Sequence, residues 1–149
     1  IYWKKEKIKS PIQLKLTDED IKLIKKDKVV IFNSIKSLVT MLGFYGFKFE
    51  VSSGNFGDIS NLDDFNDNLK NITIEKLNDD VFKERFKNLL QNDHNYKRIT
   101  RILKYFKLIG LKKINTRFLK VLKSVIFDGE TPVSQEIKNS YNTFWKKEL

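Results

Sequence analysis

The sequence predicts an all-α fold: a single compact domain of five or six helices with a long acidic surface insertion. Three observations support this prediction. Apolar residues recur at spacings of three and four along most of the chain, which is the period of an amphipathic helix. Glycines and prolines stand between these periodic runs. The 149 residues, 40% hydrophobic and 32% charged, suit one folded domain over residues 1–149.

The first third of the chain predicts an extended arm followed by two helices. Residues 1–15 are basic and contain Pro11, so we expect an extended arm. Thr17 precedes three acidic residues, which predicts a helix start, because its hydroxyl can cap and acids favour the positive end of the helix dipole. We expect helices over residues 18–25 and 28–42. The core stripe of the second comprises Val29, Phe32, Ile35, Leu38, Val39 and Leu42.

The middle of the chain is the least regular. Gly43 and Gly46 predict a helix end followed by a turn. Residues 47–50 alternate phenylalanine with charged residues, which indicates a short strand or an extended connector. One such run without a partner run does not make a sheet. Residues 52–80 are turn-rich, acidic and rich in asparagine, and we interpret them as the surface insertion.

Four further helices are expected after the insertion. They begin near residues 80, 94 and 115 and behind Thr131-Pro132, where the threonine would cap and the proline would occupy the first turn. The last helix would bury Val133, Ile137, Tyr141 and Phe144 on one face.

Composition excludes several classes of protein. Without cysteine the chain can form neither a disulfide nor a thiolate metal site. Its apolar stretches are far shorter than the roughly 18 residues that indicate a membrane helix. No signal peptide is visible. We therefore expect an intracellular protein without cofactor or bound metal, with an organelle or a virion as further locations.

The positive charge is concentrated at the carboxy-terminal end. The net charge of the chain is +10, and residues 94–149 alone carry 13 lysines and arginines against four acids. A basic rim is expected there from Lys104, Lys112, Lys113, Arg117, Lys120 and Lys123. Such a rim can follow a phosphate backbone or can be an ordinary solvated helix face. Lysine, asparagine and isoleucine are all frequent, as in proteins from AT-rich genomes.

Three segments, in this order, resemble the conserved domain of the opioid growth factor receptor family. They are Met41-Leu42-Gly43-Phe44-Tyr45-Gly46, then Arg85-Phe86 with Asn88-Leu89, and then His94-Asn95 with the run from Arg98 to Lys104, closing at Gly110-Leu111. Leu16-Thr17 and the alternation of residues 47–50 fit the same pattern. The resemblance covers roughly residues 16–125.

The resemblance implies a non-catalytic module that binds a protein or a peptide. Animal members of the family are described as perinuclear and nuclear peptide receptors, so the resemblance also implies a nuclear or cytoplasmic location. No combination of nucleophile, base and acid stands out in the sequence, and we predict no catalytic residue. The alternative is a basic structural subunit of a larger assembly, with nucleic acid or in a virus or organelle.

Two groups of residues are candidates for the binding site. His94, Arg98, Arg101 and Tyr105 fall on one helical face, at spacings of four, three and four. This face suits a peptide carboxylate or another anion, because arginine binds such groups in pairs of hydrogen bonds. The alternative is a face in contact with solvent or paired with Asp80 and Glu84. Phe44 and Tyr45 either line a peptide groove or fill the core.

Overall fold

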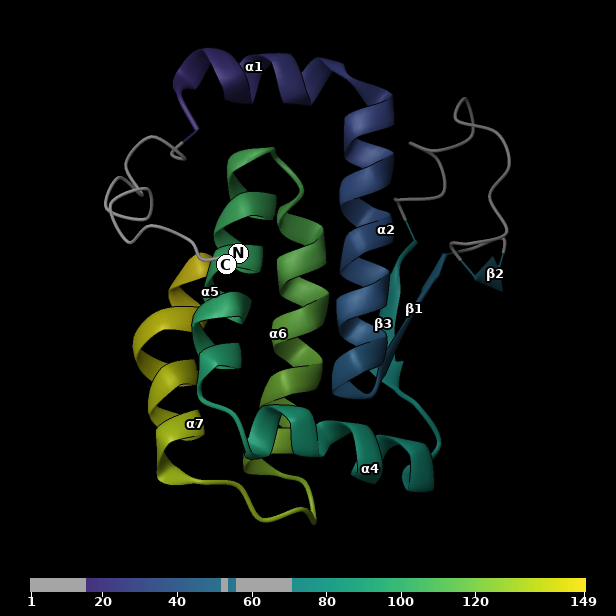
Figure 1. Ribbon diagram of the computed structural model, residues 1–149, viewed down its shortest axis with the longest axis vertical. Coiled ribbons are helices and arrows are strands. Elements are labelled where there is room, and N and C mark those ends of the chain that lie inside the picture. The colour runs from purple at the N-terminus through teal and green to yellow at the C-terminus, as the bar shows by residue number, and fades with distance from the viewer. Residues whose placement is uncertain (1–15, 52–53, 56–70) are drawn as a thin grey trace, which may run out of the picture.

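The computed structural model describes residues 16–51, 54–55 and 71–149, and its architecture is mostly helical (Figure 1). The helices are α1 (Asp18–Lys26), α2 (Lys28–Tyr45), α4 (Asp79–Leu90), α5 (His94–Leu108), α6 (Lys112–Phe127) and α7 (Gln135–Ser140). A π-helical turn (Tyr141–Trp145) and a 3₁₀ turn (Lys146–Glu148) continue α7. The predicted all-α class is therefore confirmed, and no helix in the described ranges is long and apolar enough to cross a bilayer.

The core lies between α2, α5 and α6, which run side by side, with α4 across one end and α7 against α5 (Figure 1). The helices α2, α4, α5 and α6 bury most of the apolar stripe that their sequences predict, because positions three and four apart share a face. Val29, predicted in the stripe of α2, is instead 54% exposed in the first turn of that helix. The helix α1 begins as expected, since Thr17 and Asp20 form a capping box. Unlike the others, α1 contains no buried residue.

A small sheet was not expected and forms beside α2. The strand β1 (Phe47–Val51) pairs antiparallel with β2 (Gly54–Asn55) and with β3 (Thr73–Lys76). The partner run is short and far along the chain, with Phe49 opposite Ile74. Phe47 fixes the sheet to the helices, because its ring lies 5.7 Å from that of Phe82 and 6.1 Å from that of Phe118.

The acidic insertion predicted over residues 52–80 is not confirmed. Residues 73–76 form β3, and α4 begins at Asp79 with Asn78 as its cap. Most of the remaining segment, like the predicted arm over residues 1–15, lies outside the described residues.

Two predictions about the last helix are wrong. It begins at Gln135 with Ser134 as its cap, and Thr131-Pro132 belongs to the preceding loop. Trp145 is wholly buried where Phe144 was expected, and the Phe144 side chain is 49% exposed. The π-helical turn explains the exchange. A wider turn holds more residues, so the buried face continues from Ile137 and Tyr141 to Trp145.

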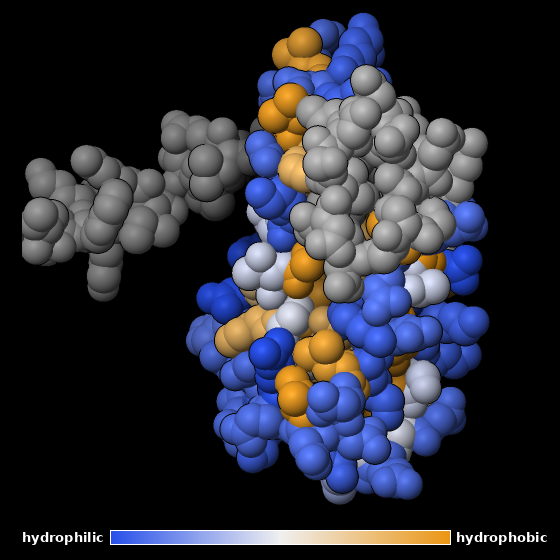
Figure 2. Space-filling model, turned by 90° about the vertical axis from the view of Figure 1, so that its right-hand side faces the viewer, coloured by the Kyte–Doolittle hydropathy of each residue, from blue (hydrophilic) through white to orange (hydrophobic). Residues whose placement is uncertain are grey.

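The face formed by α2 and the sheet is shown in Figure 2, where hydrophobic residues form a broken strip among hydrophilic ones. The exposed large hydrophobic residues of α2 are Val29, Val30 and Phe44. Scattered apolar residues of this kind are normal on a protein surface.

Candidate functional site

Several residues of the motifs named above meet at one point, where α2 ends, α4 ends and α5 begins. The Tyr45 hydroxyl donates a 3.0 Å hydrogen bond to Oδ1 of Asn95, which is 1% exposed. A guanidinium nitrogen of Arg98 donates to the same oxygen at 3.1 Å. The Asn95 side-chain amide donates to the carbonyl of Asn88 at 2.8 Å. One buried asparagine thus joins three helices.

The end of α2 is held by two further side chains of α4. The Asn88 amide donates to the carbonyl of Phe44 at 2.8 Å, and Arg85 donates to the carbonyl of Gly43 at 3.0 Å. The last carbonyls of a helix have no hydrogen-bond donor within the helix, so these two bonds satisfy carbonyls that would otherwise lack a donor from the protein. We call the set Tyr45, Arg85, Asn88, Asn95 and Arg98 the helix clasp.

Burial raises the pKa of Tyr45 to about 12, while the nearby Arg98 guanidinium partly offsets that rise. The phenol therefore keeps its proton at neutral pH and remains a hydrogen-bond donor. Its side chain has no exposed surface, so Tyr45 fills the core rather than lining a groove. Phe44, next to it, is 43% exposed.

The four residues predicted on one face of α5 have separate surroundings. Arg98 belongs to the clasp, and Tyr105 shares a 2.7 Å hydrogen bond with Ser34 of α2. His94 is exposed at the helix start. Arg101 lies beside a cavity between α5 and α7 and also beside a hollow between α2 and α5. The ion pair recorded for Glu84 is with Lys87, not with an arginine of α5.

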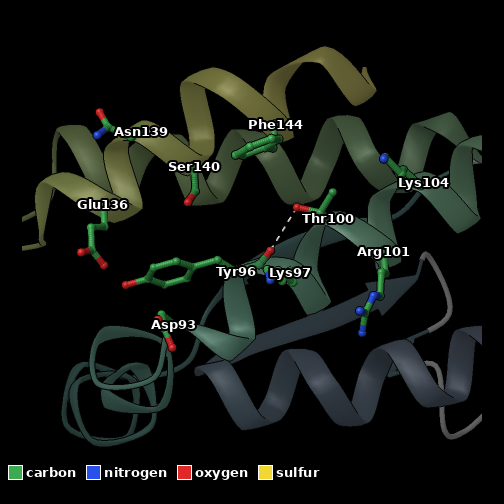
Figure 3. A pocket seen from close by; sticks show the side chains of 10 residues that line it. All are labelled: Asp93, Tyr96, Lys97, Thr100, Arg101, Lys104, Glu136, Asn139, Ser140 and Phe144. Atoms are coloured by element: carbon green, nitrogen blue, oxygen red, sulfur yellow. Dashed lines mark hydrogen bonds between the residues drawn. The ribbon is translucent and has the colours of Figure 1, made fainter. Parts of the chain in front are cut away.

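A groove lies between α5 and α7 and has a volume of about 680 Å³ (Figure 3). We call it the α5–α7 groove. One wall is formed by α5 and the residue before it, and its lining residues are Asp93, Tyr96, Lys97, Thr100, Arg101 and Lys104. The residues of the other wall are Glu136, Asn139, Ser140 and Phe144. The size is within the range of ordinary ligand pockets.

The two walls of the groove are fastened together beneath it. The indole N–H of Trp145 donates to the carbonyl of Tyr96 at 3.3 Å and to Oγ1 of Thr100 at 3.2 Å. Thr100 in turn donates to the Tyr96 carbonyl at 3.1 Å (Figure 3). Because Trp145 is wholly buried, these contacts fix the spacing of α5 and the carboxy-terminal turn.

The groove has a distinct charge at each end. Asp93 and Glu136 stand at one end, and Arg101 and Lys104 stand at the other (Figure 3). Lys97 lines the groove between them along α5. Phe144 lies on the opposite wall, and Nζ of Lys147 lies 5.6 Å from the centre of its ring. The groove therefore offers positive charge beside an exposed aromatic surface.

The predicted basic rim is split between two places. Five of its members are on α6: Lys112, Lys113, Arg117, Lys120 and Lys123. Lys104 is on α5 and lines the α5–α7 groove instead. Arg117 and Lys120 border a shallow hollow between α6 and β3, where the Nε atom of Arg117 is buried without a hydrogen-bond partner.

The family model described as the opioid growth factor receptor conserved region matches residues 77–146. Over these residues the chain is similar to that family. In mouse, opioid growth factor receptor-like protein 1 is 28% identical over 118 residues, which cover 78% of this chain and 21% of the mouse protein. The chain thus spans about a fifth of the length of that relative. No solved structure matches the chain.

Every residue that lines the α5–α7 groove lies inside the matched opioid growth factor receptor region. Sequence reasoning found Arg101 and Lys104 but assigned them to two different sites. The signal that links them is the spacing of Lys97, Arg101 and Lys104, which puts all three on one side of α5. Glu136 and Phe144 had no such signal, because their placement depends on how α7 packs against α5.

Proposed function

We propose that this chain, which is similar to the opioid growth factor receptor family over residues 77–146, is a non-catalytic interaction module that binds a peptide segment of another protein in the α5–α7 groove. The observation that carries the proposal is the groove itself. A half-exposed phenylalanine and a row of cations face a preformed cavity within the matched region. Binding pockets for peptides combine an apolar anchor surface with a few placed polar groups.

The chemistry of the groove lining favours binding over catalysis. Its side chains include no histidine and no cysteine, and the hydroxyl of Thr100 is already engaged by Trp145 and Tyr96. Within the described residues no three metal-ligating side chains come together. Neither the family match nor the fold favours the alternative of a nucleic-acid assembly subunit. The family resemblance favours a partner inside the cell.

The proposal is tested by selecting displayed random peptides on the purified domain and remeasuring the selected peptides on two variants. Phe144→Ala removes the aromatic wall of the groove, and we expect at least about a tenfold loss of affinity, typical of an anchor residue. Phe44→Ala is the matched control, because its ring is similarly exposed but lies on α2. Both variants should keep the wild-type circular dichroism spectrum.

Two results would contradict the proposal. One is a selection that yields no binding peptide. The other is a set of peptides whose affinity falls with Phe44→Ala and not with Phe144→Ala, which would move the site to the end of α2.

A further inference from the structure

We infer that the α5–α7 groove takes an acidic peptide segment, with its carboxylates along α5 and an apolar side chain against Phe144. This inference rests on the proposed function and names the chemistry and direction of the occupant. Three features of the groove carry it: the row of cations on one wall, the exposed ring of Phe144 on the opposite wall, and the acidic pair at one end.

The row of cations consists of Lys97, Arg101 and Lys104, all exposed. Their spacing of four and three residues spans about 10 Å of helix, the length of about three residues of extended peptide. None of the three makes an ion pair with a described acidic residue. Like charges held in a row repel one another, so carboxylates placed between them would relieve that repulsion.

The opposite wall decides between a peptide and a nucleic acid. Phe144 on that wall exposes about half of its surface. An apolar side chain on the occupant would cover Phe144. A nucleic-acid backbone following the groove would also have to pass Asp93 and Glu136, and its phosphates would be repelled there.

The acidic pair also sets the direction of the occupant. Asp93 immediately precedes α5, and Glu136 lies in the first turn of α7, so both mark the same end of two parallel helices (Figure 1, Figure 3). Arg101 and Lys104 mark the other end. A peptide with its carboxylates in one half would therefore lie with that half toward Lys104.

The test uses a fluorescent peptide that carries one phenylalanine and four glutamates on one side of it. Its control has glutamine in place of each glutamate. Anisotropy titrations at low and physiological salt should show the acidic peptide binding about tenfold more tightly, with the difference shrinking as salt screens the charges. Equal affinity of the two peptides, with binding still lost in Phe144→Ala, would overturn this inference and leave the proposed function standing.

Matched protein variants locate the effect. The pair Lys97→Glu and Arg101→Glu should weaken the acidic peptide about tenfold, whereas Lys120→Glu with Lys123→Glu makes the same charge change on α6 and should shift it less than about threefold. Equal losses in the two double variants would overturn the groove assignment. If poly-uridine displaces the peptide and itself depends on Phe144, the occupant is a nucleic acid and the inference is wrong.

The direction has its own readout. A photoreactive group at the glutamate end of the peptide should cross-link to the part of α5 around Lys104, and a group at the other end should cross-link near Glu136. Mass spectrometry of the digested complex reports the sites. The opposite pattern would contradict the assigned direction.

Discussion

Replacing Asn95 by leucine tests whether the helix clasp holds α2, α4 and α5 together. Leucine has a similar size, so the change removes the polar groups of Asn95 without opening a large cavity. It leaves the Tyr45 hydroxyl and the Asn88 carbonyl without the partners they now have. Arg98 is exposed and can turn toward water, so the loss of its hydrogen bond to Asn95 adds little to the cost in stability.

The size of the effect follows from these two groups. A buried polar group left without a partner costs about 1–3 kcal/mol, so Asn95→Leu should lower the free energy of unfolding by about 3 kcal/mol. Tyr45→Phe should cost only about 1 kcal/mol, because the Asn95 oxygen keeps its bond from Arg98. In the double variant, Tyr45→Phe with Asn95→Leu, there is no tyrosine hydroxyl that could be left without a hydrogen-bond partner. Its cost should therefore fall below the sum of the two single costs by about 1 kcal/mol.

Urea unfolding followed by far-ultraviolet circular dichroism measures all three variants, with the slope of the transition as a check on two-state behaviour. Asn33→Leu is the control, since Asn33 is exposed on α2 and should change stability by less than about 0.5 kcal/mol. Additive costs in the double variant, or a cost for Asn95→Leu no larger than that of the control, would refute the reasoning.

Two further predictions concern the same end of α2. Gly46→Ala should destabilise by about 2–3 kcal/mol, because φ is 100° and the added Cβ would lie 3.0 Å from a ring carbon of Phe82. Gly43 lies inside a helix, and an added Cβ would be 3.7 Å from its nearest atom, so Gly43→Ala should stabilise the domain by up to about 1 kcal/mol. Thermal unfolding in which the Gly46→Ala variant melts at a higher temperature than the Gly43→Ala variant would contradict both predictions. The raised pKa of Tyr45, about 12, means that the native state holds this proton more tightly than the unfolded chain does. The stabilisation that comes from the protonated Tyr45 hydroxyl is complete below pH 10. It is lost between about pH 10 and 12, and this loss lowers the free energy of unfolding by at most about 2–3 kcal/mol. Tyr45→Phe should make the stability fall less between pH 8 and 11, and urea unfolding midpoints over this range measure the difference. Burial also raises the pKa of Tyr141, so some loss of stability at alkaline pH should remain in the variant.

The helices could be predicted from the sequence because their signals are local. A stripe of apolar residues and a capping residue lie within a few positions of each other, as at Thr17. The sheet could not, because its register joins Phe49 to Ile74 across a long separation, and β3 shows only one buried residue. The exchange of Phe144 for Trp145 was equally hidden, since both residues are aromatic and the π-helical turn alone decides between them.

The residues that line the α5–α7 groove could be predicted on one wall only. The spacing of the cations of α5 shows that they share one face of the helix. The groove that they line could not be predicted, because its opposite wall comes from a helix about 40 residues later. The clasp residues carried the family resemblance, yet their role was hidden for a different reason. Arg85 and Asn88 bind backbone carbonyls of Gly43 and Phe44, and a sequence does not show which carbonyls are left open by the end of a helix.

The clasp and the groove are connected through α5, which presents different residues to each. Asn95 fixes the rotation of α5 by bonding to α2 and α4, while Thr100 and the Tyr96 carbonyl bond to Trp145 on the other side. A helix held at both sides cannot rotate, so its remaining side presents Lys97, Arg101 and Lys104 at a fixed distance from Phe144. The residues that carry the family resemblance thus need not contact a partner to contribute to the proposed peptide binding. They hold in place the helix whose other side forms the groove.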